Sequence, residues 1–392
     1  MLVSTGAEEF MQDPAVALLV ELVSIDSVNP ALVNGGAGET EIAEAVSRHL
    51  EASGLRVERQ DAAPGRPNIV GVLEGLQPGR SLMLCGHLDT VGVEGMPAPF
   101  HPVEREGRLY GRGAQDMKGG LAAILSAVET LVRRGLAAGR VVVAAVADEE
   151  HESVGASQLV KKWTADAAIV TEPTDLAIGV AHKGFSWVEV ETRGRAAHGS
   201  RPAEGEDAIL RMGRVLEQLE SLSAEFASRL PHPLLGPASL HGSLIKGGRE
   251  LSTYPDRCVL QLERRTLPGE APDAALSELR GILELLACED PAFRFSVRHL
   301  FSQPPYATPA GSPIVEDLAS VLASSGREVR REGMSFWTDA AILGSAGIPS
   351  VVFGPGGSGL HGLEEYVRID EVVLCRDVLV ETAIRYCAGQ AG

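Results

Sequence analysis

The sequence predicts an α/β protein whose larger domain is a doubly wound, mostly parallel sheet and whose smaller domain is an inserted α+β unit. Apolar strand-like runs alternate with helical segments in residues 1–180 and again in residues 303–392, which is typical of a parallel sheet covered by helices. In residues 181–302 polar and apolar positions alternate along the strands, which is typical of an antiparallel sheet with one solvated face. These three ranges are the predicted domain boundaries.

The first part of the chain begins with two predicted helices, at residues 13–30 and 38–54, where apolar side chains recur at helical spacing. Asn29-Pro30 ends the first helix, and Gly54 supplies a C-terminal stop for the second. Short apolar runs bounded by turn residues predict strands. The expected order continues with strands at 56–60, 68–75 and 81–89, a helix at 118–135, a strand at 140–150, a helix at 155–163 and a strand at 167–173.

The insert and the last part of the chain follow the same two patterns. Amphipathic spacing predicts helices, and period-two alternation predicts the strands of the insert. Within the insert we expect strands at 184–198, 258–268 and 293–301 and helices at 205–222 and 271–287. The last part is expected to contain a helix at 312–326, a strand at 348–356 and a closing helix at 372–389.

Composition excludes several classes of protein. With 392 residues, 44% hydrophobic content and 22% charged content, the chain is a globular protein large enough for two domains. The formal net charge of -18 argues against a nucleic-acid partner, because phosphate binding depends on basic patches. No apolar run approaches the length of a membrane span, and the N-terminus has no basic region before an apolar stretch. We expect neither a membrane anchor nor an export signal.

The cysteines indicate a reducing compartment. There are five of them, scattered and without a C-x-x-C pair, so the sequence predicts neither a disulfide framework nor a thiolate zinc site. A cytoplasmic location fits this best. Cys85, inside the run SLMLC, is interpreted as a small buried hydrophobe rather than a nucleophile.

Acids and histidines follow the predicted strands at the points where the strands end. The residues are His87 and Asp89 in CGHLDT, Asp116 in GRGAQDMKGG, Glu149 and Glu150 in ADEE, Glu172 in TEP, and the late His361 in LHGLEEY. Open α/β sheets bind ligands at the carboxyl ends of their strands. The pattern therefore predicts a two-metal hydrolase.

Counting ligands supports this prediction. Dinuclear zinc sites combine imidazole and carboxylate ligands, and one carboxylate can bridge the two ions. His87, Glu172 and a bridging Asp116 would hold one ion, and Glu150, His361 and the same Asp116 would hold the other. Asp89 would accept the second N–H of His87 and orient its ring. Glu149 remains as the general base, which takes a proton from metal-activated water and passes it to the leaving amine.

Each motif alone has a simpler interpretation. Carboxylates after a strand often stabilise a helix N-terminus, so ADEE, Asp116 and the later Asp339 are each compatible with helix entry or capping. A lone histidine is more often a surface residue than a ligand. The stretch GPGGSG formally satisfies G-x-G-x-x-G, but no clear helix follows it, so we discount dinucleotide binding. The joint placement at strand ends favours the metal site.

The motifs, in their order along nearly the whole chain, resemble the M20 metallopeptidase family. They are GHLDT, GRGAQDMKGG, ADEE, TEP, AAHGSRP, GGRELSTYPDRC, RTLPGE and GPG followed by LHGLEEYV. The family includes acetylornithine deacetylase, succinyl-diaminopimelate desuccinylase, aminoacylase and carboxypeptidase G. The resemblance implies a catalytic domain with two zinc or cobalt ions, the same seven ligand and catalytic residues, and an inserted lid domain that usually forms a homodimer.

The resemblance also implies further residues outside the strand ends. His198 matches a histidine that reaches the partner's active site and stabilises the oxyanion. Arg265 matches an arginine that faces the substrate carboxylate, and alternation places Arg264 on the opposite face of the strand, so that one of the two is expected to be solvated. Ser252 stands where the family usually has asparagine, which changes the polar contacts to the substrate. Gly356 is expected in a loop whose backbone approaches the substrate.

The predicted function is amide hydrolysis of an N-acyl amino acid, of the deacetylase or desuccinylase type. A second possibility within the family is a di- or carboxypeptidase that splits a short peptide. A possibility of another class is a non-catalytic protein that binds metal or a partner on the same fold. Because both the base and all ligands are present in the sequence, the enzyme is favoured.

Overall fold

The computed structural model describes residues 13–389, which form two compact units. The larger unit comprises the chain up to Val180, Thr308–Glu332 and the chain from Thr338 onward. The smaller unit comprises Ala181–Ala307 together with the short segment Gly333–Trp337. The smaller unit is thus an insertion in the larger one, and it also includes five residues that follow the insertion in the sequence.

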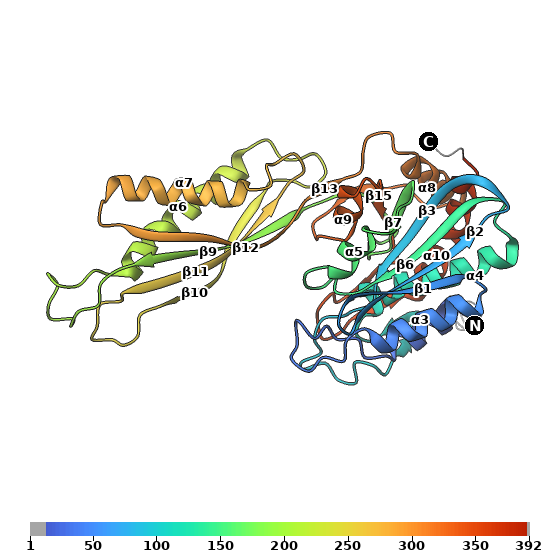
Figure 1. Ribbon diagram of the computed structural model, residues 1–392, viewed down its shortest axis with the longest axis horizontal. Helices are drawn as coiled ribbons and strands as arrows, with labels where there is room; N and C mark the ends of the chain where they lie inside the picture. Colours follow the sequence, from blue (N-terminus) through green and yellow to red (C-terminus); the bar gives the residue numbers. More distant parts are fainter. Residues whose placement is uncertain (1–12, 390–392) are drawn as a thin grey trace. The chain divides into compact units, whose positions relative to one another are not determined.

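The sheet of the larger unit has a parallel centre and antiparallel flanks (Figure 1). Its strand order is β1-β2-β6-β3-β7-β15-β8. The four strands from β6 to β15 run parallel, whereas β1, β2 and β8 pair antiparallel with their neighbours. The bounds are β1 Arg56–Ala63, β2 Arg66–Glu74, β3 Gln77–His87, β6 Ala138–Val146, β7 Ala167–Val170, β8 Ile178–His182 and β15 Ser350–Val352.

Helices cover both faces of this sheet, as a doubly wound fold requires. One group packs together and against β1, β2, β3 and β6, and a second pair, α5 and α9, packs near β6, β7 and β15 (Figure 1). The first group is α2 Pro14–Val23, α3 Thr40–Ala52, α4 Gly119–Arg134, α8 Pro313–Ser324 and α10 Ile369–Cys387, and the second is α5 Val154–Leu159 and α9 Ala340–Ser345. Alanine, valine and leucine side chains of the first group and of the sheet fill the core between them.

A small antiparallel sheet, with strand order β16-β17-β5-β4, completes the larger unit. Its strands are β4 Val103–Arg105, β5 Arg108–Tyr110, β16 Gly357–Ser358 and β17 Tyr366–Arg368. The register pairs Tyr366 with Tyr110. This pairing brings the loop between β16 and β17 next to the turn that follows β5, although about 250 residues separate them along the chain.

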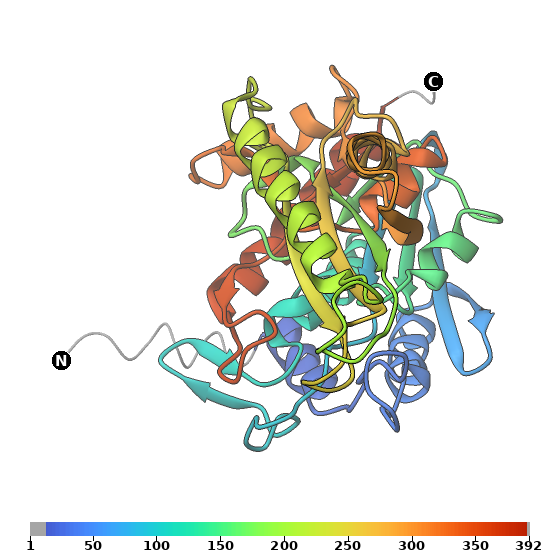
Figure 2. The same ribbon diagram turned by 90° about the vertical axis from the view of Figure 1, so that its left-hand side faces the viewer.

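The smaller unit is a four-stranded antiparallel sheet with two helices on one face. The strand order is β10-β11-β9-β12, and the long helix α6 lies along the strands (Figure 2). Alternate residues such as Val188, Val190 and Leu262 face the helices and are buried. The bounds are β9 Gly184–Arg193, β10 Ser239–Gly247, β11 Arg257–Thr266, β12 Arg294–Gln303, α6 Ala208–Ser228 and α7 Ala274–Glu289. Two short strands, β13 Tyr306–Ala307 and β14 Arg331–Met334, lie in the returning chain.

The predicted α/β class is confirmed, and most predicted elements are present with ends shifted by a few residues. The strands missed were β8, β10, the short strands β13 and β14, and the pieces of the small sheet. Strand β10 carries mostly exposed side chains, so its sequence lacks the apolar alternation that marks a half-buried strand. Among residues 13–389, no helix is both long and apolar enough to cross a lipid bilayer.

Candidate metal centre

Three parallel strands end at one edge of the sheet and deliver the predicted acids and histidine. His87 is the last residue of β3 and lies opposite Val146, the last residue of β6. Cys85 lies opposite Val170, the last residue of β7. Because neighbouring parallel strands point the same way, the residues that follow β6 and β7 emerge beside His87. Glu149, Glu150 and Glu172 are those residues.

Asp116 and His361 reach the same place from two loops. Asp116 lies in the turn Ala114–Lys118, which immediately precedes α4 and has non-helical backbone angles at Asp116 and Met117. It is therefore not the N-cap of α4, a position that Lys118 occupies. His361 lies between β16 and β17 with a left-handed φ of 57°, a conformation that costs a non-glycine residue free energy and is most common at functional positions.

The two oxygens of the Asp116 carboxylate face two different histidines. Oδ1 lies 3.1 Å from Nε2 of His87, and Oδ2 lies 3.3 Å from Nε2 of His361. The same nitrogen of His361 lies 3.3 Å from Oε2 of Glu150, and Nε2 of His87 lies 3.9 Å from Oε1 of Glu172. Asp116 therefore lies between two clusters, each with one histidine and one glutamate.

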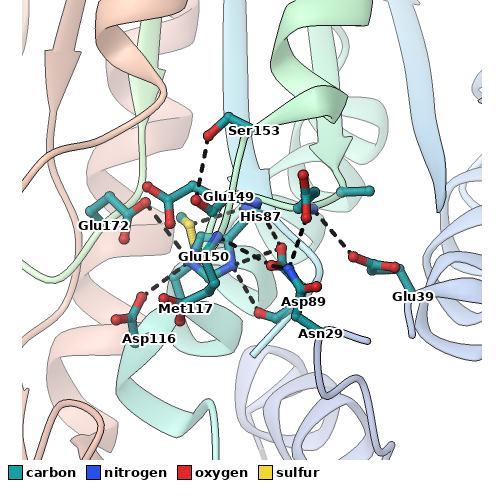
Figure 3. A network of polar contacts seen from close by, with 12 residues as sticks. Asn29, Glu39, His87, Asp89, Asp116, Met117, Glu149, Glu150, Ser153 and Glu172 are labelled. Atoms are coloured by element: carbon teal, nitrogen blue, oxygen red, sulfur yellow. Dashed lines mark hydrogen bonds and ion pairs between the residues drawn. The ribbon is translucent and has the colours of Figure 1, made fainter. Parts of the chain in front are cut away.

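Two overlapping groups of side chains are close enough to hold a metal ion. His87, Asp116 and Glu150 present ligand atoms within 4.8 Å of one another, and so do His87, Glu149 and Glu172. Figure 3 shows Asp116 and Glu172 on one side of His87 and Asp89 on the other. By distance alone, Glu149 is as close to this centre as the predicted ligands are.

The chemistry of the donor set fits divalent cations. Oε1 of Glu150 and Oε1 of Glu172 are buried and have no hydrogen-bond partner among the described residues. Burial and the charge of Asp116 raise the pKa of Glu150 to about 7. Burial also raises the pKa of Glu172 well above its ordinary value, although the charge of His87 opposes this. Buried carboxylates so close together need a compensating positive charge, and imidazole with carboxylate is a typical zinc ligand set.

The negative charge of the neighbouring carboxylates also raises the pKa values of both histidines. Burial alone would lower the pKa of His87, but Glu172 and Asp116 raise it well above its ordinary value. Hydrogen bonds to Asp116 and Glu150 raise the pKa of His361 to about 10. Nδ1 of His87 lies 2.9 Å from the backbone carbonyl of Asp89. A carbonyl only accepts, so Nδ1 donates to it, and Nε2 is the ring nitrogen that faces the centre.

Asp89 is close to the centre, but its carboxylate acts differently from our expectation. Nδ1 of His87 is 3.7 Å from Oδ1 of Asp89, whereas the backbone carbonyl of Asp89 takes the hydrogen bond. The carboxylate instead accepts from the backbone N–H groups of Glu149 and Glu150, at 3.0 and 3.2 Å. Asp89 thus orients the histidine through its main chain and the two glutamates through its side chain.

A buried network behind Asp89 was not predicted. Asn29 donates to Asp89 and to Asp148, at 2.7 and 3.0 Å. Arg66 donates two hydrogen bonds to Glu39 and one to Asp148. Asp148 has a left-handed φ of 69°, immediately before the two glutamates. These residues come from separate elements. Apart from Asp148, the second residue of ADEE, they match none of the quoted motifs, so the sequence offered little signal for the network.

A second unpredicted group joins the Asp116 turn to the His361 loop. Glu365 is buried and accepts from the backbone N–H groups of Gly113, Gln115 and Asp116, at 2.9, 2.9 and 3.1 Å. Arg112 donates to Glu365 at 2.6 Å and to the carbonyl of Gly362 at 3.0 Å. Arg112 belongs to the motif GRGAQD and Glu365 to LHGLEEY, both quoted above. Their place in motifs that carry a predicted ligand was the one sequence signal that could have identified them.

Asp339 and Cys85 are buried next to the centre. Asp339 is at the N-cap position of α9 but makes no capping hydrogen bond. Its Oδ1 has no partner among the described residues, and burial raises its pKa to about 7, with the charge of His87 opposing. Cys85 is buried and unpaired, and burial raises the pKa of its thiol well above the ordinary value. A thiol of this kind is not a nucleophile.

His198, Ser252 and Arg265 all belong to the smaller unit. His198 forms an isolated bridge with Thr253, and the carbonyl of Ser252 accepts from Gly199, so these two residues are neighbours. Arg265 is on β11 opposite Phe185, at the other end of that strand.

The two neighbouring arginines of β11 do face opposite sides, but neither is simply solvated. Arg264 is buried, donates to Glu270 and Glu278, and stacks on Phe226. The expectation that one of the pair is solvated is wrong, because two carboxylates pair with Arg264 inside the unit.

The backbone polar groups of Gly356, which we expect in a loop that approaches the substrate, have partners within the protein. Its N–H donates to Glu371 at 2.8 Å, and its carbonyl accepts from the backbone N–H of Arg368 at 2.9 Å. A side chain at this position would collide with Asp175 and Arg368. Both contacts are with the ends of flexible side chains, so a larger residue would displace that ion pair.

The fold and the site together define a two-domain α/β protein with a histidine and carboxylate centre suited to divalent metal ions. Comparisons with known proteins agree. The model of peptidase family M20/M25/M40 matches residues 83–385. An acetylornithine deacetylase from Myxococcus xanthus is 34% identical over 387 residues, which cover 95% of this chain and 98% of the relative. The chain therefore belongs to peptidase family M20/M25/M40, whose members hydrolyse amide bonds.

Two further comparisons indicate the range of the family. An N-formyl-4-amino-5-aminomethyl-2-methylpyrimidine deformylase from Bacillus subtilis is 28% identical, with 88% of each chain covered. The fold is also that of a dinuclear metal-binding peptidase of the M20 family from Bacillus subtilis, with a TM-score of 0.75, 16% identity and coverage of 97% and 99%. Similar folds in the family thus accompany different substrates.

Proposed function

We propose that this protein is a two-metal amidohydrolase that removes the acyl group from an N-acyl amino acid. The single observation that carries the proposal is the carboxylate of Asp116, whose two oxygens face Nε2 of His87 and Nε2 of His361 at 3.1 and 3.3 Å. A carboxylate presented in this way suits a bridging ligand between two ions. The products are a free amine and a carboxylate.

The proposed ligands are His87, Glu172 and Asp116 for one ion and Glu150, His361 and Asp116 for the other. The partnerless oxygens of Glu150 and Glu172 support this assignment. Zinc is the proposed metal, with cobalt as the alternative, because both accept imidazole and carboxylate ligands. When bound, the ions would polarise the amide carbonyl and lower the pKa of water.

Glu149 is the proposed general base. Burial and the charge of Glu172 raise the pKa of its carboxyl well above the ordinary value, which favours a group that takes a proton and then gives it to the leaving amine. Its backbone N–H is held by Asp89 at 3.0 Å, so the side chain starts from a fixed position. Asp89 acts as the residue that positions Glu149 and Glu150.

We also propose that the protein is a homodimer formed through the smaller unit. Strand β10 is an edge strand, paired on one side with β11, and its Leu244 and Ile245 are 67% and 56% exposed. An exposed apolar edge strand is a ready surface for a second copy.

Strand geometry supports the dimer from another direction. His198 is beside Thr253, before β11 begins at Arg257, and Arg265 is eight residues further along that strand. At ~3.3 Å per residue, Arg257 and Arg265 of one protomer are about 26 Å apart along β11, and the Thr253 that His198 pairs with precedes Arg257. If His198 stabilises the oxyanion and Arg265 binds the carboxylate of the same substrate, His198 must come from a second protomer.

The proposed substrate is a small molecule, an N-acyl amino acid, and the identity to a deacetylase supports this choice. A di- or carboxypeptidase acting on short peptides is the second candidate, supported by the fold. The acidic charge supports neither a nucleic-acid nor a membrane partner. Five free cysteines are compatible with a cytoplasmic location.

The test is release of free amine from N-acetyl, N-succinyl, N-formyl and dipeptide substrates, with metal-stripped protein compared with zinc- or cobalt-restored protein. We expect release that depends on metal, and the active group of substrates would assign the branch. Fully loaded protein that hydrolyses none of them would contradict the proposal and favour a binding role.

A further inference from the structure

Aromatic side chains gather around Arg265 in the smaller unit. Aromatic residues make up only 4% of the chain, yet two of its three tryptophans, Trp187 and Trp337, lie here. The ring centroids of Phe185 and Trp187 are 5.2 Å apart, and that of Phe301 is 5.9 and 5.7 Å from them. Trp337 meets Phe185 edge-on at 6.4 Å. This group, Phe185, Trp187, Phe301 and Trp337, is called the aromatic cluster below.

Strand pairing places this cluster on the face of the sheet that α6 and α7 do not cover. Phe185 lies opposite Arg265, and Trp187 lies opposite both Glu263 on β11 and Phe301 on β12. Their neighbours along β9, Ser186 and Val188, are buried on the helix side. Trp187 is 38% exposed, so a bound molecule can reach the cluster.

The other end of the same face is polar. Glu189 accepts from Gln261 and Arg298, and Glu191 accepts from Arg193 and Arg257. One end of this face is aromatic and exposed, whereas the rest carries ion pairs. Exposed apolar patches bordered by polar residues commonly mark binding sites, so we interpret the aromatic end as a binding surface.

Arg265 supplies a cation at the edge of this cluster. Its Cζ lies 5.6 Å from the ring centroid of Phe185. Nη2 donates to the carbonyl of Ser335 at 2.7 Å, and Nη1 lies 3.6 Å from Glu263. A guanidinium has five N–H donors, so these two partners leave donors for a ligand carboxylate. Glu263 also accepts from Nε1 of Trp187 at 2.9 Å, which holds the tryptophan beside the arginine.

We propose that this face is a subsite for a substrate that joins an aromatic ring to a carboxylate. Arg265 binds the carboxylate, and Phe185 and Trp187 stack against the ring. The proposal rests on the proposed function, because Arg265 enters it as a residue that faces the substrate. It narrows the substrate class to N-acyl derivatives of aromatic amino acids, in place of those with aliphatic cationic side chains such as ornithine.

Binding is measured first, by tryptophan fluorescence. In a Trp163→Phe background only Trp187 and Trp337 emit, so the signal reports the cluster. The full-length protein, zinc-restored and metal-stripped, is titrated with 3-phenylpropanoate and with 3-cyclohexylpropanoate, which has the same size without the aromatic ring. We expect the aromatic acid to bind about two- to tenfold more tightly, as ring stacking predicts. Equal dissociation constants for the two acids would overturn the proposal.

Variants separate the two parts of the subsite. Arg265→Gln should weaken binding of both acids by about tenfold or more, because a charge-assisted hydrogen bond is lost. Arg257→Gln, on the same strand and face, is the matched control and should bind as the parent protein does. Phe185→Leu should remove the preference for the aromatic acid, and circular dichroism checks that it folds. Unchanged binding by Arg265→Gln contradicts the assignment.

Hydrolysis distinguishes this proposal from the proposed function. We expect kcat/KM for N-acetylphenylalanine to exceed that for N-acetylcyclohexylalanine by about two- to tenfold. Hydrolysis of both substrates without a preference would contradict the aromatic subsite and would still support the proposed amidohydrolase function. Aromatic carboxylate binding through Arg265 with no hydrolysis of any amide would do the reverse.

Discussion

The carboxylate of Asp89 and the backbone N–H of Glu149 are joined by a 3.0 Å hydrogen bond, while the backbone carbonyl of Asp89 holds Nδ1 of His87 at 2.9 Å. One residue therefore orients a proposed metal ligand and the proposed base through different atoms. A substitution of its side chain changes the hydrogen bond to Glu149 and leaves the main-chain hydrogen bond to His87 in place.

Asp89→Asn should lower kcat/KM by about 10- to 100-fold, the usual effect of losing a supporting partner of a metal site. The new amide can accept through one atom only, so it cannot serve Asn29, Glu149 and Glu150 as the carboxylate does. Steady-state kinetics measure the change, and Asp61→Asn, at an exposed position, is the control. Full activity in Asp89→Asn would show that this hydrogen bond does not position the base.

Glu149→Ala should lower kcat by about 100- to 10,000-fold and retain both metal ions, because a general base contributes that much. Glu150→Ala, at the neighbouring position, should lose one ion as well as activity. Metal content after dialysis, measured by atomic emission, separates the two. Loss of metal from Glu149→Ala would identify it as a ligand, as its position close to His87 and Glu172 also permits.

Glu365→Gln should weaken the ion held by Glu150 and His361 by about 10- to 100-fold in affinity. Glu365 accepts from Gly113, Gln115 and Asp116, and glutamine cannot accept from all of these and from Arg112. Stepwise zinc titration against a chelator measures each ion. Glu364→Gln, at the exposed neighbouring position, should bind zinc like the parent, and equal affinities in both variants would refute this role.

Arg66→Gln should reduce the free energy of unfolding by about 3–5 kcal/mol, the typical effect of breaking a buried ion pair. Arg66 pairs with Glu39 and Asp148, whose side chains are 0% and 2% exposed, and glutamine leaves both charges uncompensated. Lys162→Gln, which breaks the exposed pair with Glu58, should change stability by less than about 1 kcal/mol. Urea unfolding measures both, and similar small losses would contradict the prediction.

His182 should make the protein less stable as the pH falls. Burial lowers the pKa of its imidazole from 6.5 to about 4. Between pH 6.5 and pH 4 the imidazole is therefore protonated in the unfolded chain and neutral in the folded chain. Stability contributed by this group is full above pH 6.5 and declines below it, by up to about 3 kcal/mol near pH 4.

The measurement for His182 is the difference in unfolding free energy between the parent and His182→Asn, from urea curves at pH 7.5, 6, 5 and 4.5. Asparagine keeps a donor for the carbonyl of Lys183, which Nδ1 of His182 contacts at 3.0 Å, but does not titrate. The parent should lose its advantage as the pH falls. Parallel curves for the two proteins would rule out this contribution.

Much of the fold followed from local patterns in the sequence. Apolar runs such as SLMLCGHLD predict a buried strand at 81–89, and β3 is that strand, although it ends two residues earlier, at His87. The direction of flanking strands did not follow, because β2 has the same apolar character as β6 yet runs antiparallel to it. Side-chain periodicity marks which residues are buried, but strand direction depends on the connection between strands.

The sequence by itself determined which acids and histidines follow the central strands, because a strand end is a local property of the chain. Only the tertiary structure decided which groups meet there: Arg66 between Glu39 and Asp148, Glu365 on the Asp116 turn, the main-chain carbonyl of Asp89 on His87, and Gly356 against Asp175 and Arg368. Except for Asp89 and His87, which are two residues apart, these partners come from separate segments of the chain. Their contacts arise when the layers of the fold close, and no short stretch of sequence encodes a distance between remote segments.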